Sequence, residues 1–172
     1  MLLLVKTWLD LCLLRKGPQD LPASGFFLGL SLCCYALVSF LVASPSSGMA
    51  EAFRLALVDI GMLTVFVAAL LYLQSKTGRI NQTLSALAGS GSLMGLFALP
   101  LVLLVNQGQP ADQVPALLAA LWLSLLIWNL FVMAHIIRHA LSSSFPIGLG
   151  AAVLYALVSM QLVATLFPQQ AV

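Results

Sequence analysis

The stretch FRLALVDIGMLTVFVAALLYLQSKTGR, residues 53–79, joins a long apolar run to a short polar turn. Its apolar part, Phe53–Leu73, is about as long as a helix that crosses a bilayer. Tyr72 lies near Lys76 and Arg79, and aromatic and basic residues together are typical of a membrane interface. The stretch therefore predicts a transmembrane helix whose C-terminal end lies at a membrane surface.

The same apolar pattern recurs on both sides of this stretch. The 172 residues are 62% hydrophobic and 7% charged, whereas soluble domains average about 25% charged residues. We therefore expect an all-α, polytopic membrane protein in which residues 23–172 form a five-helix transmembrane domain. Five spans take up most of this length, so we expect no soluble catalytic domain. The expected spans are about residues 25–43, 53–73, 84–105, 115–137 and 146–167.

Basic residues lie in alternate gaps between these spans. They precede the first span, separate the second from the third and separate the fourth from the fifth, and only Arg54 departs from this order. Because basic residues collect on the cytoplasmic side of membrane proteins with short loops, we expect a cytoplasmic N-terminus and a C-terminus outside. The compact loops favour a bacterial inner membrane. The residues that carry the pattern are Lys6, Arg15, Lys16, Lys76, Arg79 and Arg138.

Residues 1–22 are expected to form an interfacial amphipathic helix and a linker. Lys6 and Asp10 are four residues apart and share one helix face, while apolar residues such as Trp8 can enter the acyl boundary. The segment Gly17–Pro22 contains two prolines and ends the helix. We therefore expect Lys6 and Trp8 to anchor this helix at the membrane interface.

Asp59 is the most unusual polar residue, because a carboxylate inside a membrane span is costly unless it is paired, neutralised or facing water. Three roles fit its position: a hydrogen-bonded group that joins helices, a site for a proton or solute, and a contact with a partner protein. Asn129, in the fourth span, is expected to form an interhelical hydrogen bond. Counting from the outer ends of the spans places several polar residues at the depth of Asp59: Tyr35, Ser39, Ser124, Ser159 and Gln161.

His135 and His139 lie one helical turn apart at the end of the fourth span. This spacing puts both imidazoles on one helix face, as in many metal sites. No carboxylate or cysteine is clearly placed beside them, however, and Arg138 adds positive charge between them. Because cations near a helix C-terminus are favourable without a metal, we expect neither a metal nor another cofactor, with the two histidines as weak metal candidates.

The sequence Ala88-Gly89-Ser90-Gly91 resembles the G-x-S-G context of the serine in rhomboid intramembrane proteases, which place a histidine on another helix. Here Ala88 replaces the first glycine. Ser90 and His135 also lie toward the expected cytoplasmic side, whereas the site of that family opens outward. An intramembrane hydrolase that uses Ser90 and His135 is therefore the least favoured function, and we do not expect an enzyme.

The third span is rich in small residues. Gly91 and Gly95 are four residues apart, and Ala88 and Ser92 lie nearby. Such stripes let helix backbones approach closely. We expect this stripe to pack inside one chain, and self-association through an exposed glycine groove is the alternative.

Five spans, very short loops, a cytoplasmic N-terminus and a short outside C-terminus together resemble the Yip1-like membrane family. The D-L-Y-G-P signature of its eukaryotic members is absent, and Lys16-Gly17-Pro18 keeps only the last two letters at a different place. The resemblance implies a five-helix membrane fold. It carries no functional residue over to this chain, and eukaryotic members of the family assist vesicle trafficking.

The function expected from the sequence is that of a non-catalytic accessory or scaffold subunit, which supports the assembly or stability of a larger membrane complex. The loops are short, and the sequence contains no convincing catalytic set. The alternative is a small proton- or cation-coupled transporter or channel that uses Asp59. The expected partners are the lipid bilayer and membrane proteins, including a second copy of the chain. The basic residues do not form a patch, so we do not expect nucleic-acid binding.

Overall fold

The computed structural model describes residues 2–106 and 116–168, which form helices joined by short turns, with no strand among them. Five of these helices are long and apolar enough to cross a membrane, as expected for an integral membrane protein. The protein is therefore all-α in the described residues, as the sequence predicts. The five helices are α2 (Gly25–Ala43), α3 (Met49–Leu73), α4 (Ile80–Val105), α5 (Ala116–Leu141) and α6 (Phe145–Leu166).

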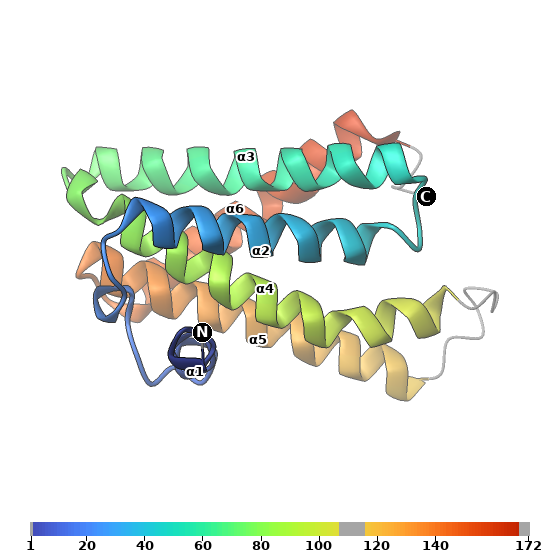
Figure 1. Ribbon diagram of the computed structural model, residues 1–172, viewed down its shortest axis with the longest axis horizontal. Coiled ribbons are helices and arrows are strands. Elements are labelled where there is room, and N and C mark those ends of the chain that lie inside the picture. Colours follow the sequence, from blue (N-terminus) through green and yellow to red (C-terminus); the bar gives the residue numbers. More distant parts are fainter. Residues whose placement is uncertain (1, 107–115, 169–172) are drawn as a thin grey trace.

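The helix α4 occupies the centre of the bundle. It packs most extensively against α2, and also contacts α1, α3 and α5, while α5 packs against α6. Figure 1 shows α2 and α3 on one side of the bundle and α4 and α5 on the other, with α6 behind them. The short α2–α3, α3–α4 and α5–α6 turns make these neighbouring helices antiparallel.

The bundle has two halves that differ in packing. We call the half that holds the α3–α4 and α5–α6 turns the basic half, because Lys76, Arg79 and Arg138 lie there. The other half, which holds the α2–α3 turn at residues 44–48, is called the cavity half.

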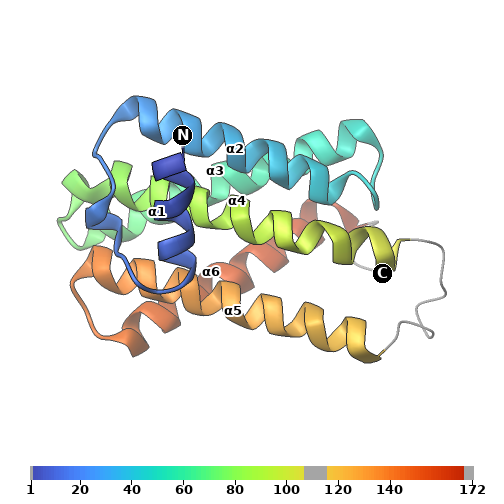
Figure 2. The same ribbon diagram turned by 60° about the horizontal axis from the view of Figure 1, so that its bottom comes forward.

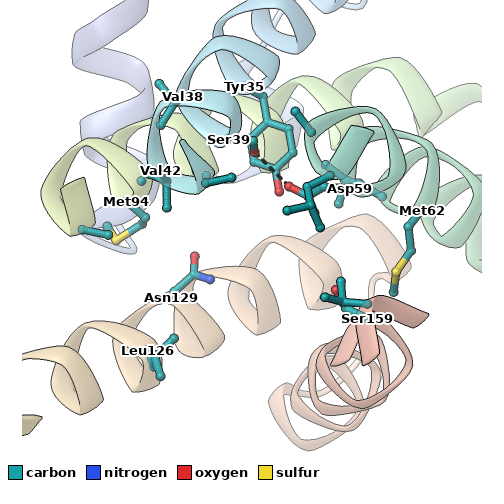
Figure 3. A pocket seen from close by; sticks show the side chains of 18 of the residues that line it. Tyr35, Val38, Ser39, Val42, Asp59, Met62, Met94, Leu126, Asn129 and Ser159 are labelled. Carbon is teal, nitrogen blue, oxygen red and sulfur yellow. Dashed lines mark hydrogen bonds between the residues drawn. The ribbon is translucent and has the colours of Figure 1, made fainter. Parts of the chain in front are cut away.

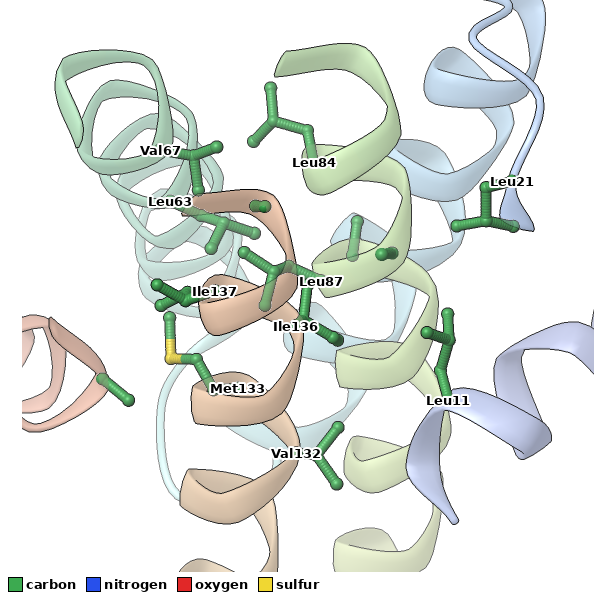
Figure 4. Packing of buried hydrophobic residues seen from close by; sticks show 14 of the residues in the cluster. Leu11, Leu21, Leu63, Val67, Leu84, Leu87, Val132, Met133, Ile136 and Ile137 are labelled. Carbon is green, nitrogen blue, oxygen red and sulfur yellow. The ribbon is translucent and has the colours of Figure 1, made fainter. Parts of the chain in front are cut away.

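The continuous core lies in the basic half. Every residue of α4 from Thr83 to Ser90 is buried, as is every residue of α5 from Val132 to Ile137. A helix that is buried on all sides needs neighbours on all sides, and α4 has them here. Figure 4 shows Leu87 of α4 close to Ile136 and Ile137 of α5.

The N-terminal helix α1 (Leu2–Cys12) crosses the bundle at a steep angle and packs against α4 and α5 (Figure 2). Trp8 is 6% exposed, and Leu11 is fully buried. The Trp8 ring lies directly on Gly89, so closely that a Cβ atom at Gly89 would overlap it. The prediction that Trp8 enters the acyl boundary is therefore wrong: protein covers the ring, because Gly89 leaves room for it. Lys6 stays exposed.

The segment that follows α1 is fastened to the bundle. It includes the short helix η1 (Pro18–Asp20), and its Lys16 Nζ forms an ion pair with Asp10 Oδ2 at 3.1 Å. Polar side chains of α4 and α5 reach backbone oxygens of this segment and of the last residue of α1. Trp128 Nε1 donates to Cys12 O at 3.1 Å, Gln82 Nε2 donates to Leu21 O at 2.8 Å, and His135 Nε2 lies 3.1 Å from Lys16 O.

The helices extend further into polar sequence than the hydropathy pattern predicts. The first turn of α3 contains Glu51, whose charge suits a helix N-terminus. In the first turn of α4, Thr83 Oγ1 donates to Arg79 O at 2.8 Å. Residue 115, the expected start of the fourth span, lies outside the described residues. The shifted ends are Met49 in place of Phe53, Ile80 in place of Leu84 and Leu141 in place of Ile137.

Candidate functional site

A cavity of about 510 Å³ lies between the helices of the cavity half. All five long helices contribute to its walls, which are mostly apolar, and it extends from Leu87 and Ser90 at the edge of the core, past Asp59, to Ser46 in the α2–α3 turn. Figure 3 shows the labelled side chains of this cavity from close by. Asp59 lies ten residues after Met49, about 15 Å along α3 from the end of the helix.

The carboxyl group of Asp59 connects three helices. Ser39 Oγ on α2 donates to Asp59 Oδ2 at 2.9 Å, and the Tyr155 hydroxyl on α6 donates to Asp59 Oδ1 at 3.4 Å. Tyr35, one turn before Ser39, points toward the same carboxyl group (Figure 3). The ring of Phe66 meets the Tyr155 ring edge-on, with 5.1 Å between their centroids, and so supports its position. Asp59 is thus held by hydroxyl groups from two neighbouring helices.

In the part of the chain that the structure describes, Asp59 has no basic side chain beside it. Among the described residues that line the cavity, none is Lys, Arg or His. The one ion pair that the described residues form joins Lys16 to Asp10 and lies on the N-terminal segment. Arg54 is on the same helix as Asp59 but is exposed and does not line the cavity. A cation that enters the cavity would therefore find a carboxyl group without a positive partner.

Two further polar side chains line the cavity. Asn129 on α5 and Ser159 on α6 both face it (Figure 3), and within the described part of the chain neither side chain forms a hydrogen bond. Their amide and hydroxyl groups are free to bind water or a solute. The expected interhelical hydrogen bond of Asn129 does not occur between the described residues.

Counting depth along the spans identified only part of this site. Tyr35, Ser39 and Ser159 lie around the cavity with Asp59, but Ser124 and Gln161 are exposed and do not line it. Ser124 Oγ instead donates to Ala120 O on its own helix at 2.7 Å.

Tyr155 is the functional candidate that the sequence analysis missed. Its hydroxyl group reaches Asp59, although the residue lies deeper in the bundle than the residues selected by depth. A signal was present, because Tyr155 is four residues before Ser159 and therefore shares its helix face.

The small residues of α4 form one wall of the cavity and pack against α2. A Cβ atom at Gly91 would lie 2.7 Å from the Tyr35 ring, and one at Gly95 would lie 2.5 Å from Val38 Cγ1. Both glycines therefore lie inside the bundle, where the sequence pattern placed them. Nearby, Ser92 Oγ donates to Ala88 O at 2.7 Å within the helix.

Ser90 and His135 have separate partners. Ser90 Oγ donates to Ala86 O at 2.8 Å on its own helix, whereas His135 Nε2 lies near the backbone of the N-terminal segment. Burial raises the pKa of Cys12 to about 11, and its thiol lies 3.8 Å from Ser90 O. In the described residues these contacts replace the serine–histidine hydrogen bond that a hydrolase would need.

The two histidines contact each other. The rings of His135 and His139 meet edge-on, with centroids 4.6 Å apart. The described residues contain no group of three or more His, Cys, Asp or Glu side chains that could hold a metal ion.

The predicted interface anchors lie at different places. Arg15 and Tyr72 are exposed, while Lys76 and Arg79 hydrogen-bond to the C-terminal end of α5. The guanidinium carbon of Arg138 lies 5.6 Å from the centroid of the Phe145 ring.

The cavity is thus the part of the molecule best suited to bind a ligand. Counting the described residues alone, it holds a carboxyl group without a basic partner, beside an amide and a hydroxyl group that form no hydrogen bond. The chain was compared with protein-family models, with curated proteins and with solved structures, and none of the three comparisons found a match.

Proposed function

We propose that this protein binds a proton or a cation at Asp59 and acts as a small membrane transporter or channel. The observation that supports the proposal is the carboxyl group of Asp59, which lies at the wall of an open cavity without a basic partner. An ionisable residue inside a membrane bundle is expensive and usually marks a path for an ion or substrate. A purely structural Asp would not need a cavity beside it.

The dimensions and walls of the cavity favour one class of solute. Its volume of about 510 Å³ is in the range typical of small-molecule sites. Its walls are mostly apolar, and their polar groups are one carboxyl group, the amide of Asn129 and the hydroxyl groups of serine and tyrosine side chains. A cation that carries apolar groups fits this combination better than a metal ion, which would need more carboxylate or carbonyl ligands than one Asp and one Asn supply.

The proposal is tested with an Asp59→Asn variant. Ser39 and Tyr155 donate to different oxygens of Asp59. The amide oxygen of Asn can accept one of these hydrogen bonds, and its NH2 group can donate to the other hydroxyl oxygen. The substitution therefore removes the charge with little change in shape. We expect binding of tetraphenylphosphonium to detergent-solubilised protein to weaken by at least about tenfold, or about 1.4 kcal/mol. Proton flux into proteoliposomes, followed with a trapped pH-sensitive dye, should be lost in the same variant.

The matched control is Ser124→Ala, because Ser124 lies at a similar depth but bonds only within its own helix. It should bind and transport like the unchanged protein. If Asp59→Asn keeps its thermal stability and both activities, Asp59 is not the site. If the variant is destabilised and the unchanged protein shows neither binding nor flux, Asp59 is a structural hydrogen-bonding residue.

We further propose that the basic half faces the cytoplasm of a bacterial inner membrane and the cavity half faces outward. The support is the arrangement of basic residues in alternate gaps. Reporter fusions after Gly78 and after Gly48 should report the cytoplasm and the outside respectively. The reverse result would invert the direction in which the cavity opens.

An accessory or scaffold subunit is the second candidate. A specific observation favours it: Gly25 and Gly29 on α2 are exposed, with no neighbouring side chain within 4 Å of an added Cβ, and Cys33 continues this face one turn later. Such a stripe allows another helix to approach closely. Purification in nanodiscs should then yield a stable protein partner that Gly29→Leu releases. We also propose that the chain belongs to the Yip1-like family, which it resembles in its five spans and short loops.

A further inference from the structure

A second cavity lies at the basic end of the molecule, far from Asp59. It has a volume of about 550 Å³, and it is lined by residues of η1, the start of α4, the end of α5 and the α5–α6 turn. Its walls contain Arg79 and Arg138, together with the hydroxyl-bearing residues Ser142, Ser143 and Ser144. No Asp or Glu is among the described residues that line it.

Arg79 is held in place by the end of α5. Its Nη1 donates to Ala140 O at 3.1 Å and to Ser142 Oγ at 2.8 Å, and lies 3.4 Å from His139 O. All of these bonds use a single nitrogen atom, so the rest of the guanidinium group is not used by the described residues. The group is therefore positioned and still able to donate.

Arg138 has a buried donor without an acceptor among the described residues. Its Nε is buried and forms no hydrogen bond, and the same is true of Ser143 Oγ across the described residues. The Nη2 of Arg138 lies 3.4 Å from His139 Nε2, and its guanidinium carbon lies 5.6 Å from the Phe145 ring centroid. A buried donor without an acceptor is unfavourable, and a bound anion would remove that cost.

The beginning of α6 adds to the positive field. Its N-cap residue is Ser144, whose side chain forms no capping hydrogen bond, and the helix that follows is 22 residues long. The N-terminus of a helix carries partial positive charge and binds phosphate groups readily. Asp20 of η1, whose neighbours Pro18 and Gln19 line the cavity, accepts a hydrogen bond from Gly17 N at 2.8 Å.

We propose that this basic cavity binds a phosphate group, held by the guanidinium groups of Arg79 and Arg138 and by the hydroxyl groups of the α5–α6 turn. Guanidinium groups suit phosphate because they donate two parallel hydrogen bonds to it. The cavity lies at one end of the transmembrane helices, where phospholipid headgroups are found, and basic pockets between membrane helices bind anionic headgroups. A phospholipid headgroup and a water-soluble phosphate ester offer the same chemistry.

The test measures the binding of three added compounds to the full chain in detergent by native mass spectrometry. Dioleoyl phosphatidylglycerol carries a phosphate, dioleoylglycerol has the same chains without one, and glycerol 3-phosphate has the phosphate without the chains. We expect dioleoyl phosphatidylglycerol to bind at least about tenfold more tightly than dioleoylglycerol. Competition by millimolar glycerol 3-phosphate would show that the cavity also accepts soluble phosphate esters, and its absence would identify a lipid site.

Arg138→Gln should abolish this preference for phosphate, because it removes the guanidinium group. The Nε atom of that group forms no hydrogen bond with the described residues, so the substitution breaks none there. Arg138→Lys should restore part of it, since the charge returns without the paired donors. Arg54→Gln removes an equal charge from an exposed position in the other half and should change nothing. Equal binding of the two lipids to the unchanged protein, or an unchanged preference in folded Arg138→Gln, would overturn the proposal.

Discussion

The basic half and the cavity half are built from the same helices, but side chains fill the space between the helices in the first and a cavity remains in the second. In the basic half, α1 covers α4 and α5, and the side chains from Thr83 to Ser90 are buried. In the cavity half, about 510 Å³ remains open between the helices beside Asp59, whereas the cavity of about 550 Å³ in the basic half lies at the end of the bundle, outside the packed core. Protein interiors are normally packed with few voids larger than a water molecule, so the open half carries a structural cost that the packed half has to offset.

The composition of α4 explains much of this difference. The residues from Ser85 to Ser92 are almost all small, which lets the Trp8 ring and the neighbouring helices approach closely. Beyond them, large side chains such as Leu96 and Phe97 are exposed on the outer surface of the bundle. We therefore expect stability to depend mainly on the basic half and solute binding on the cavity half.

Gly89→Leu should have the largest effect. The Trp8 ring occupies the space that the new side chain needs, so α1 would have to leave its position. We expect the free energy of unfolding to fall by at least about 4 kcal/mol, or folding to fail. The measurement is thermal unfolding in detergent. Gly61→Leu is the control, because Gly61 is exposed on α3 with no atom near an added Cβ; equal losses would contradict the packing of α1.

The same Leu→Ala change in each half should sharpen the comparison. Leu84 is 2% exposed in the basic half, whereas Leu126 is 51% exposed in the cavity half. We expect Leu84→Ala to cost about 2–4 kcal/mol of unfolding free energy and Leu126→Ala less than about 1 kcal/mol. Chemical denaturation of the two variants measures both values. A larger loss at Leu126 would mean that the cavity half carries the stability.

Most of the fold could be predicted from the sequence, because long apolar runs and basic turns follow directly from the membrane environment. The position of α1 could not. Trp8 and Leu11 look like lipid-facing residues of an amphipathic helix, and their burial depends on contacts with Gly89 and other residues of α4 and α5. A contact between residues far apart in sequence leaves no periodic pattern of apolar residues in either segment.

The candidate site could be predicted in part. Depth can be counted along antiparallel helices at 1.5 Å per residue, and the count brought Tyr35, Ser39 and Ser159 to Asp59. It could not give the rotation of each helix about its axis. Ser124 therefore had the right depth and the wrong face.

Trp128→Phe should have the smallest effect of the three pairs. The substitution removes the hydrogen bond from Trp128 Nε1 to Cys12 O, which is 3.1 Å long and joins α5 to the end of α1. We expect a loss of about 1 kcal/mol, measured by thermal unfolding. Trp122→Phe removes the same group from a residue that lines the cavity and should cost less; the opposite order would argue against the attachment of α1.

The most direct test of the central claim is solvent access to each half. A protein with Ala at Cys12, Cys33 and Cys34 provides the background for Ser159→Cys and Ser85→Cys. Ser159 lines the cavity, whereas Ser85 is fully buried in the basic half.

In nanodiscs, a water-soluble cationic methanethiosulfonate reagent should modify Cys at position 159 at least about tenfold faster than at position 85, where reaction requires local unfolding. Asp59→Asn should slow the reaction at position 159, because the negative charge attracts the reagent. Equal rates at the two positions, or no reaction at position 159, would contradict the account of a packed basic half and an open cavity half.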